Sequence, residues 1–152
     1  MKELRILSPS GIVGYGFPEE SFMAGVAMKP DLIACDGGST DPGPYYLGSG
    51  IPFTNATAVK RDLTLMLKAA CELNIPLVIG TTGSAGADVH MARELDIIRE
   101  IAKEQKLSFK MAVISSEFDK DDLVEHLNAG RIEKLGPAPV VTEEDIRSSS
   151  HI

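Results

Sequence analysis

The stretch that decides the fold is LVIGTTGSAGAD, at residues 77–88. Its apolar start predicts a short buried strand, and a loop of Gly, Ser, Thr and Asp follows before a helical pattern begins. The same order occurs earlier in RILSPSGIVGYG, at residues 5–16, and in LIACDGGSTD, at residues 32–41. In an open parallel sheet such loops emerge at the carboxyl edge of the strands, where these folds bind ligands. We therefore expect three separate segments to meet at one site.

Strands and helices alternate along the chain. The patterns predict strands over 4–8, 31–35, 76–79 and 109–114, and helices over 18–28, 56–73, 87–105 and 121–128. The apolar runs are continuous rather than alternating, which is typical of strands buried on both faces. This order predicts an α/β fold, a doubly wound three-layer αβα sandwich with a mostly parallel, Rossmann-like or flavodoxin-like sheet. A long loop rich in Gly and Pro is expected over 36–55.

Two parts of unequal size are expected. Residues 1–136 form the α/β ligand-binding domain, and residues 137–152 form a link and the start of a further helix. Thr142 with Asp145 three residues later resembles the capping box that begins a helix. No apolar face develops in the residues that follow, so the sequence is interpreted as the N-terminal part of a longer chain.

The charge and hydropathy of the chain limit the kinds of partner that it can bind. The 152 residues carry a net charge of −7, which argues against nucleic acid as a partner because phosphate backbones require clustered Lys and Arg. No apolar run is long enough to span a bilayer and no signal peptide is visible, so a cytoplasmic protein with a small-molecule ligand and no membrane partner is expected. A homo-oligomer remains open. Cys35 and Cys71 are interpreted as small buried thiols.

The first loop has glycines in a G-x-x-G-x-G spacing, at Gly11, Gly14 and Gly16. Glycine lets the backbone approach a ligand closely, and free amides at the start of the following helix can receive an anion. The spacing departs from the dinucleotide fingerprint, although Asp36 falls where a ribose-binding acid would be. A tight turn without a ligand is the alternative.

The second loop places two carboxylates, Asp36 and Asp41, on either side of a glycine pair. Two oxygen ligands of this kind suit a divalent cation such as Mg²⁺, or the hydroxyl groups of a substrate. The alternative is that they cap local turn amides. Tyr45 and Tyr46 follow, and they either line a pocket or pack back on the sheet.

The third loop leads into a helix that begins near His90, a candidate for acid–base chemistry because imidazole titrates near neutral pH. A histidine without a role is the alternative. Lys60 and Arg61 either bring positive charge to this edge or lie on a solvated face.

The candidate catalytic residues are Asp36, Asp41 and His90. The candidate ligand-binding residues are Ser10, Gly11, Gly14, Gly16, Gly37, Gly38, Ser39, Thr40, Thr81, Thr82, Gly83 and Ser84.

Four segments together resemble the N-terminal region of AtuA-like proteins, which are named for acyclic terpene utilisation: RILSPSG (5–11), GYGFP (14–18), DGGSTDPGPYYLG (36–48) and KRD (60–62). The resemblance spans nearly the whole chain. It implies a bacterial or archaeal catabolic protein acting on an acyl-CoA or another carboxylic acid, and it supplies no set of catalytic residues. Three classes stay open: an enzyme of small-molecule or acyl-CoA catabolism, a non-catalytic subunit that binds a nucleotide or CoA, and an NAD(P)-dependent oxidoreductase.

Overall fold

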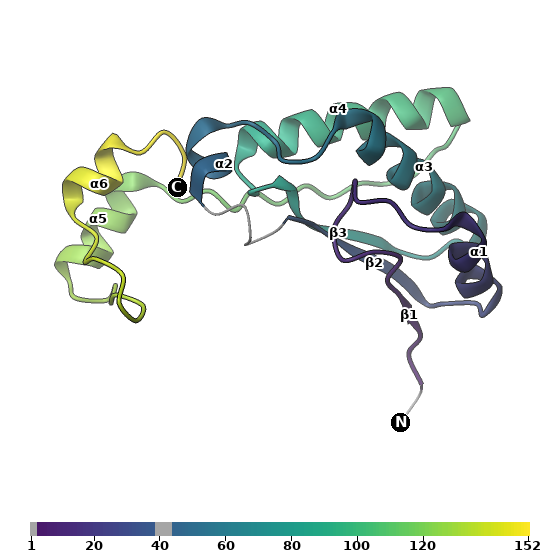
Figure 1. Cartoon of the computed structure of the whole chain (residues 1–152), viewed down its shortest axis with the longest axis horizontal. Helices are drawn as coiled ribbons and strands as arrows, with labels where there is room; N and C mark the ends of the chain where they lie inside the picture. Colours follow the sequence, from purple (N-terminus) through teal and green to yellow (C-terminus); the bar gives the residue numbers. More distant parts are fainter. Residues whose placement is uncertain (1–2, 39–43) are drawn as a thin grey trace.

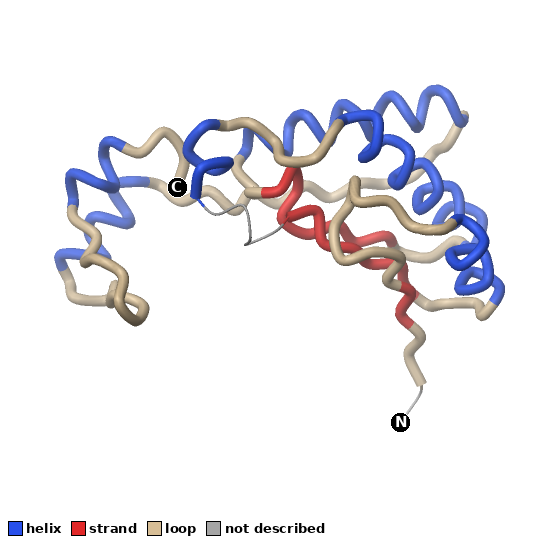
Figure 2. The backbone as a smooth tube through the Cα atoms, viewed as in Figure 1, coloured by secondary structure: helices blue, strands red, loops and turns tan. Residues whose placement is uncertain are grey.

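The computed structural model describes residues 3–38 and 44–152. Its centre is a parallel sheet of three strands in the order β1-β2-β3. The strands are β1 (Ile6–Leu7), β2 (Leu32–Gly38) and β3 (Leu77–Ser84). Ile6 pairs with Leu32, and Ile33 pairs with Leu77. The α/β class and the parallel sheet predicted from the sequence are confirmed (Figures 1 and 2).

Helices connect the strands as the patterns predict. α1 (Glu19–Ala27) joins β1 to β2, α3 (Ala56–Leu73) joins β2 to β3, and α4 (Asp88–Gln105) follows β3. The side chain of Asn55 accepts a hydrogen bond from the Thr57 amide and caps the start of α3. Asn74, with φ of 53°, ends α3 in the left-handed conformation that commonly closes a helix.

One hydrophobic core lies between the sheet and these helices. Phe22 of α1, Leu63 and Met66 of α3 and Ile101 of α4 join Ile33 of β2 in a single buried cluster. Because α1, α3 and α4 all contribute to one cluster, they cover the same face of the sheet (Figure 1). Lys60 of α3 also forms ion pairs with Glu100 and Glu104 of α4, at 2.9 and 2.8 Å. Its charge therefore joins two helices of this layer.

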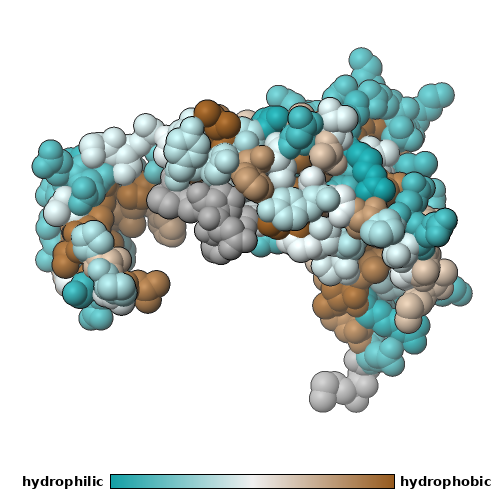
Figure 3. Space-filling view, in the orientation of Figure 1, coloured by the Kyte–Doolittle hydropathy of each residue, from teal (hydrophilic) through white to brown (hydrophobic). Residues whose placement is uncertain are grey.

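The other face of the sheet carries exposed apolar side chains. Leu7 and Leu77 pack into the core, so their neighbours Ile6 and Val78 point to the opposite side, where they are 58% and 53% exposed. Figure 3 shows hydrophobic surface beside β1, where Leu4 and Ile6 lie. Within the described residues the sheet therefore has one helical layer.

Two predictions about the region around the sheet are wrong. Residues 109–114 are extended but pair with no strand in the described chain, and Phe109, Met111 and Val113 are exposed. A parallel strand needs cover on both faces as well as a ladder partner, and this segment has no cover. Apolar composition alone does not distinguish a paired, covered strand from an exposed segment that pairs with no strand. The long loop expected over 36–55 also contains a short helix, α2 (Pro44–Ser49).

The last fifth of the chain forms a helical pair at one end of the molecule. α5 (Lys120–Asn128) and α6 (Glu143–Ser148) pack on each other, with Val124 and Ile146 buried (Figure 1). The predicted capping box is confirmed, since the Thr142 hydroxyl accepts from the Asp145 amide and the Asp145 carboxylate accepts from the Thr142 amide. No helix in the described ranges is both long and apolar enough to cross a bilayer.

Candidate functional site at the carboxyl edge

The three glycine-bearing segments meet at the carboxyl ends of the strands. The amide of Val13 donates to the carbonyl oxygen of Asp36 at 2.8 Å, which places the first loop over the end of β2. The thiol of Cys35 donates to the Ser10 carbonyl at 3.2 Å. Gly38 of β2 pairs with Ser84 of β3, so the second and third segments also lie side by side.

In the first loop the glycine amides bind a carboxylate of the chain itself. The amides of Gly14 and Gly16 donate to Oδ2 of Asp62 at 2.9 and 3.0 Å. Both glycines have positive φ, +95° and +79°, which lets the two N–H groups point at one acceptor. Gly11 is exposed, and a Cβ added there would meet no atom within 4 Å, while the Ser10 hydroxyl donates to the Ile12 carbonyl. Two of the amides that the sequence offers to a ligand are thus used internally.

Arg61 brings positive charge to the same loop. Its Nη1 donates to Oδ1 of Asp62 at 2.8 Å, and its guanidinium lies 5.0 Å from the centre of the Phe17 ring. The Asp62 side chain is fully buried, whereas the Arg61 side chain is 42% exposed. A cleft of about 450 Å³ that is wide open to solvent lies beside this pair. It is lined by Gly14, Tyr15, Gly16, Phe17, Pro18, Ala58, Arg61 and Asp62.

The second segment belongs to the strand more than the sequence predicts. Gly37 and Gly38 are buried at the end of β2, and their lack of a side chain lets β3 approach. Oδ1 of Asp36 accepts a hydrogen bond from the Gly38 amide at 2.9 Å. This is the capping of a local turn amide that the sequence offered as the alternative to binding a metal or a substrate. Ser39, Thr40 and Asp41 lie outside the described residues. Among the residues described, no group of three or more His, Cys, Asp and Glu side chains is placed to hold a metal ion.

The third segment continues β3 as far as Ser84, although the sequence predicts that the strand ends at Ile79. The register shifts here, because Asp36 pairs with Gly80 while Gly38 pairs with Ser84. Positive φ at Thr81, Gly83 and Ser84 accompanies this bulge. Gly83 and Ser84 are buried, and the Ser84 hydroxyl accepts from the Phe53 amide at 3.1 Å. Thr81 and Thr82 stay accessible at the rim.

His90 lies in the interior, with 1% of its surface exposed. Its Nε2 is 3.3 Å from the carbonyl oxygen of Ile51. One helical turn further on, Glu94 is 3% exposed and its Oε2 accepts from the Gly83 amide at 2.7 Å. The other polar atoms, Nδ1 of His90 and Oε1 of Glu94, have no hydrogen-bond partner among the described residues. Burial raises the pKa of the Glu94 carboxyl above its ordinary value.

We expect Glu94→Gln to stabilise the protein at pH 7 by about 1 kcal/mol. The folded state favours protonated Glu94, so its contribution to stability falls as pH rises from the unfolded pKa towards the raised folded value. Glutamine keeps an oxygen for the Gly83 amide and carries no charge. Urea unfolding between pH 4 and pH 8 should show the gain growing with pH. A variant less stable than the native chain at pH 8 would contradict this interpretation.

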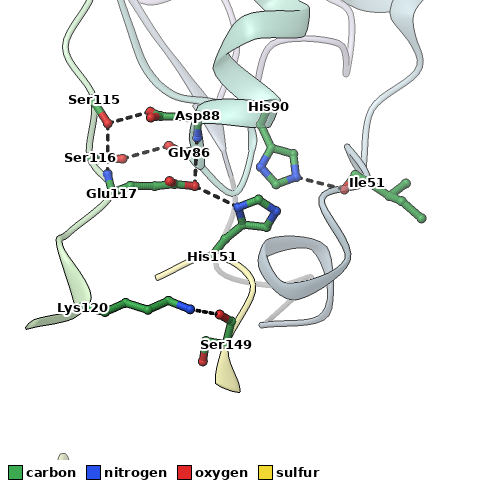
Figure 4. Close-up of polar contacts among 10 residues, drawn as sticks. All are labelled: Ile51, Gly86, Asp88, His90, Ser115, Ser116, Glu117, Lys120, Ser149 and His151. Atoms are coloured by element: carbon green, nitrogen blue, oxygen red, sulfur yellow. Dashed lines mark hydrogen bonds and ion pairs between the residues drawn. The ribbon is translucent and has the colours of Figure 1, made fainter. Parts of the chain in front are cut away.

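Glu117 and His151 form a carboxylate–imidazole pair that the sequence patterns do not reveal (Figure 4). Nδ1 of His151 lies 3.0 Å from Oε1 of Glu117, which also accepts from the amide of Asp88 at the start of α4. Ser115 donates to the Asp88 carboxylate at 2.6 Å. The pair therefore joins His151 to the start of α4. The two residues are 34 positions apart. The only signal in the sequence is that Glu117 is an acidic residue shortly after the segment 109–114.

Cys35 is buried beneath the first loop. Burial raises the pKa of its thiol to about 11, whereas Cys71 on α3 is only half-buried. Because the thiolate is the reactive form, a thiol reagent at pH 7.5 should modify Cys71 first and Cys35 only after unfolding. Comparing the native chain with Cys71→Ser checks this: the variant should react slowly until denaturant is added. Rapid reaction of folded Cys71→Ser would contradict the placement of Cys35.

Comparison with models of known protein families gives no match, and comparisons with curated proteins and with solved structures give none either.

Proposed function

We propose that this protein binds a small metabolite carrying a carboxylate or a phosphate at the carboxyl edge of its sheet, as an AtuA-like catabolic protein. The observation that carries the proposal is Arg61, whose guanidinium is anchored by Asp62 and Phe17 at the mouth of the cleft. Guanidinium has five N–H donors in a planar fork that matches carboxylate and phosphate oxygens. Anchoring one side leaves other donors for an anion.

The local charge balance supports an anionic ligand. Two backbone amides bind Oδ2 of the buried Asp62 carboxylate, and the ion pair with Arg61 uses one guanidinium nitrogen, Nη1, on the other oxygen. A protein with a net charge of −7 repels anions in general, so an anionic ligand requires a local positive group such as the partly exposed Arg61 at the cleft. The AtuA-like assignment belongs to the same proposal and is supported by the four segments quoted above, which include Arg61 and Asp62 themselves.

A thermal-shift panel tests the proposal. Inorganic phosphate, propanoate, CoA esters, nucleotides, NAD and Mg²⁺ are compared, because a ligand that binds only the native state raises the midpoint of unfolding. We expect anionic ligands to raise the midpoint of the native chain and to have little effect on Arg61→Gln. The matched control is Arg99→Gln, which removes an equal charge from an exposed ion pair on α4. Equal shifts in both variants, or no shift with any anion, would refute the proposal.

The three-layer arrangement is also a proposal. It is supported by the exposed apolar side chains of Ile6 and Val78 on the face of the sheet opposite the helices. If a second layer covers this face in solution, Val78→Lys should lower the midpoint of thermal unfolding by several degrees. An unchanged midpoint would favour a sheet covered on one face.

A further inference from the structure

Four aromatic rings form a continuous row that begins at the cleft. We name Tyr15, Phe53, Tyr46 and Tyr45 the aromatic row. The ring centres of Tyr15 and Phe53 are 6.0 Å apart, those of Phe53 and Tyr46 are 5.3 Å apart, and those of Tyr46 and Tyr45 are 5.1 Å apart. The row therefore connects the glycine loop to α2 across the segment that leads into α3.

Three rings of the aromatic row are exposed and the fourth, Tyr46, is half-buried. Tyr15 is 57% exposed, Phe53 is 41% exposed and Tyr45 is 64% exposed, and none of the four rings belongs to the main buried cluster. Ile51, also exposed, lies two residues from Phe53. Adjacent exposed apolar groups of this kind commonly mark a binding surface, whereas single exposed apolar residues need no explanation.

Hydrogen bonds fix the backbone at two residues of the aromatic row, Phe53 and Tyr15. The amide of Phe53 donates to the buried hydroxyl of Ser84, and Tyr15 lies between two glycines whose amides are both bound by Asp62. The backbone beneath the rings is thus fixed from both β3 and α3. A surface that is already ordered loses little conformational entropy when a ligand binds.

Tyr15 belongs to both the aromatic row and the cleft that Arg61 lines. A ligand with its acid group at Arg61 meets Tyr15 next. We propose that the aromatic row binds a planar aromatic ring carried by the ligand, and this rests on the proposed function. The rings meet at 53°, 79° and 88°, which are the tilted and edge-to-face arrangements that aromatic rings favour. Aromatic rings attract one another in offset and edge-to-face geometries, an attraction that a saturated group lacks.

The chain contains a built-in probe for this proposal. It has three tyrosines and no tryptophan, and all three tyrosines belong to the aromatic row. Tyrosine fluorescence therefore reports on this surface alone. The experiment titrates the protein with 3-phenylpropanoate, 3-cyclohexylpropanoate and propanoate, which share a carboxylate and differ in the group attached to it. Calorimetry measures the same dissociation constants without relying on fluorescence.

We expect 3-phenylpropanoate to change the tyrosine emission saturably and to bind about fivefold more tightly than 3-cyclohexylpropanoate, as one aromatic contact allows. Phe53→Leu changes a ring of the aromatic row that does not line the cleft, and it should remove this preference and leave propanoate binding unchanged. Phe109→Leu, which changes an exposed ring outside the aromatic row, should behave as the native chain does.

The outcomes separate the two proposals. If all three acids bind with the same affinity and Arg61→Gln weakens each, the proposed function stands and the aromatic row does not recognise the ring. Binding of 3-phenylpropanoate without any change in tyrosine emission overturns the inference in the same way. If none of the acids binds by calorimetry, and phosphate does not either, the proposed function and the inference both fail.

Discussion

Asp62→Ala is expected to lower the free energy of unfolding by about 3–5 kcal/mol, a large part of the stability of a domain of this size. The carboxylate is fully buried and joins the first loop to α3 through the Gly14 and Gly16 amides and Arg61. Alanine leaves two amides and a guanidinium without their acceptor, and each lost partner carries a desolvation penalty. Urea unfolding of the native chain and the variant measures the effect.

Asp62→Asn is the matched control for this prediction. Asparagine has nearly the same shape and keeps one oxygen, which can accept from the glycine amides, but it presents no charge to Arg61. Its stability should fall between those of the native chain and Asp62→Ala. If Asp62→Ala unfolds within about 1 kcal/mol of the native chain, Asp62 does not organise the loop and the proposed structure of the cleft is wrong.

Gly37→Ala is expected to destabilise the protein by about 2–3 kcal/mol, because overpacking at a rigid contact shifts the backbone. A Cβ at this position would lie 2.7 Å from the carbonyl oxygen of Gly80 and 3.1 Å from the Cα of Thr82. Both are backbone atoms, so neither can move without displacing β3. The midpoint of urea unfolding is the measurement.

Gly11→Ala provides the comparison for Gly37→Ala, since a Cβ at Gly11 would have no atom within 4 Å. Its stability should stay within about 0.5 kcal/mol of the native chain. If the two variants are equally stable, the close approach of β2 and β3 at the carboxyl edge is not present in solution.

Local signals predict the helices well. The apolar spacing of α3 depends on residues within a turn or two, so a short stretch of sequence is enough to predict this helix. The capping box at Thr142 is predicted for the same reason. Strand limits are harder, because the extension of β3 to Ser84 depends on pairing with Gly38, which is distant in the chain.

The site is predicted in outline only. The meeting of the three loops follows from the parallel order of the strands. The partner of the glycine amides cannot be predicted in this way. Asp62 lies 48 residues from Gly14, and in the sequence nothing separates it from the other polar residues of its helix. The burial of His90 likewise depends on how α4 packs beneath Gly83. The two residues are so close that a Cβ added at Gly83 would lie 2.6 Å from the Cβ of His90.

The most direct test of the central claim is an amide nuclear magnetic resonance titration with propanoate and phosphate, which suits a chain of 16.3 kDa. We expect the largest chemical shift changes to fall on Gly14, Tyr15, Gly16 and Arg61, and we expect Arg61→Gln to remove them. Changes confined to α5 and α6, or none up to millimolar concentrations of both anions, would contradict a binding site at the carboxyl edge of the sheet.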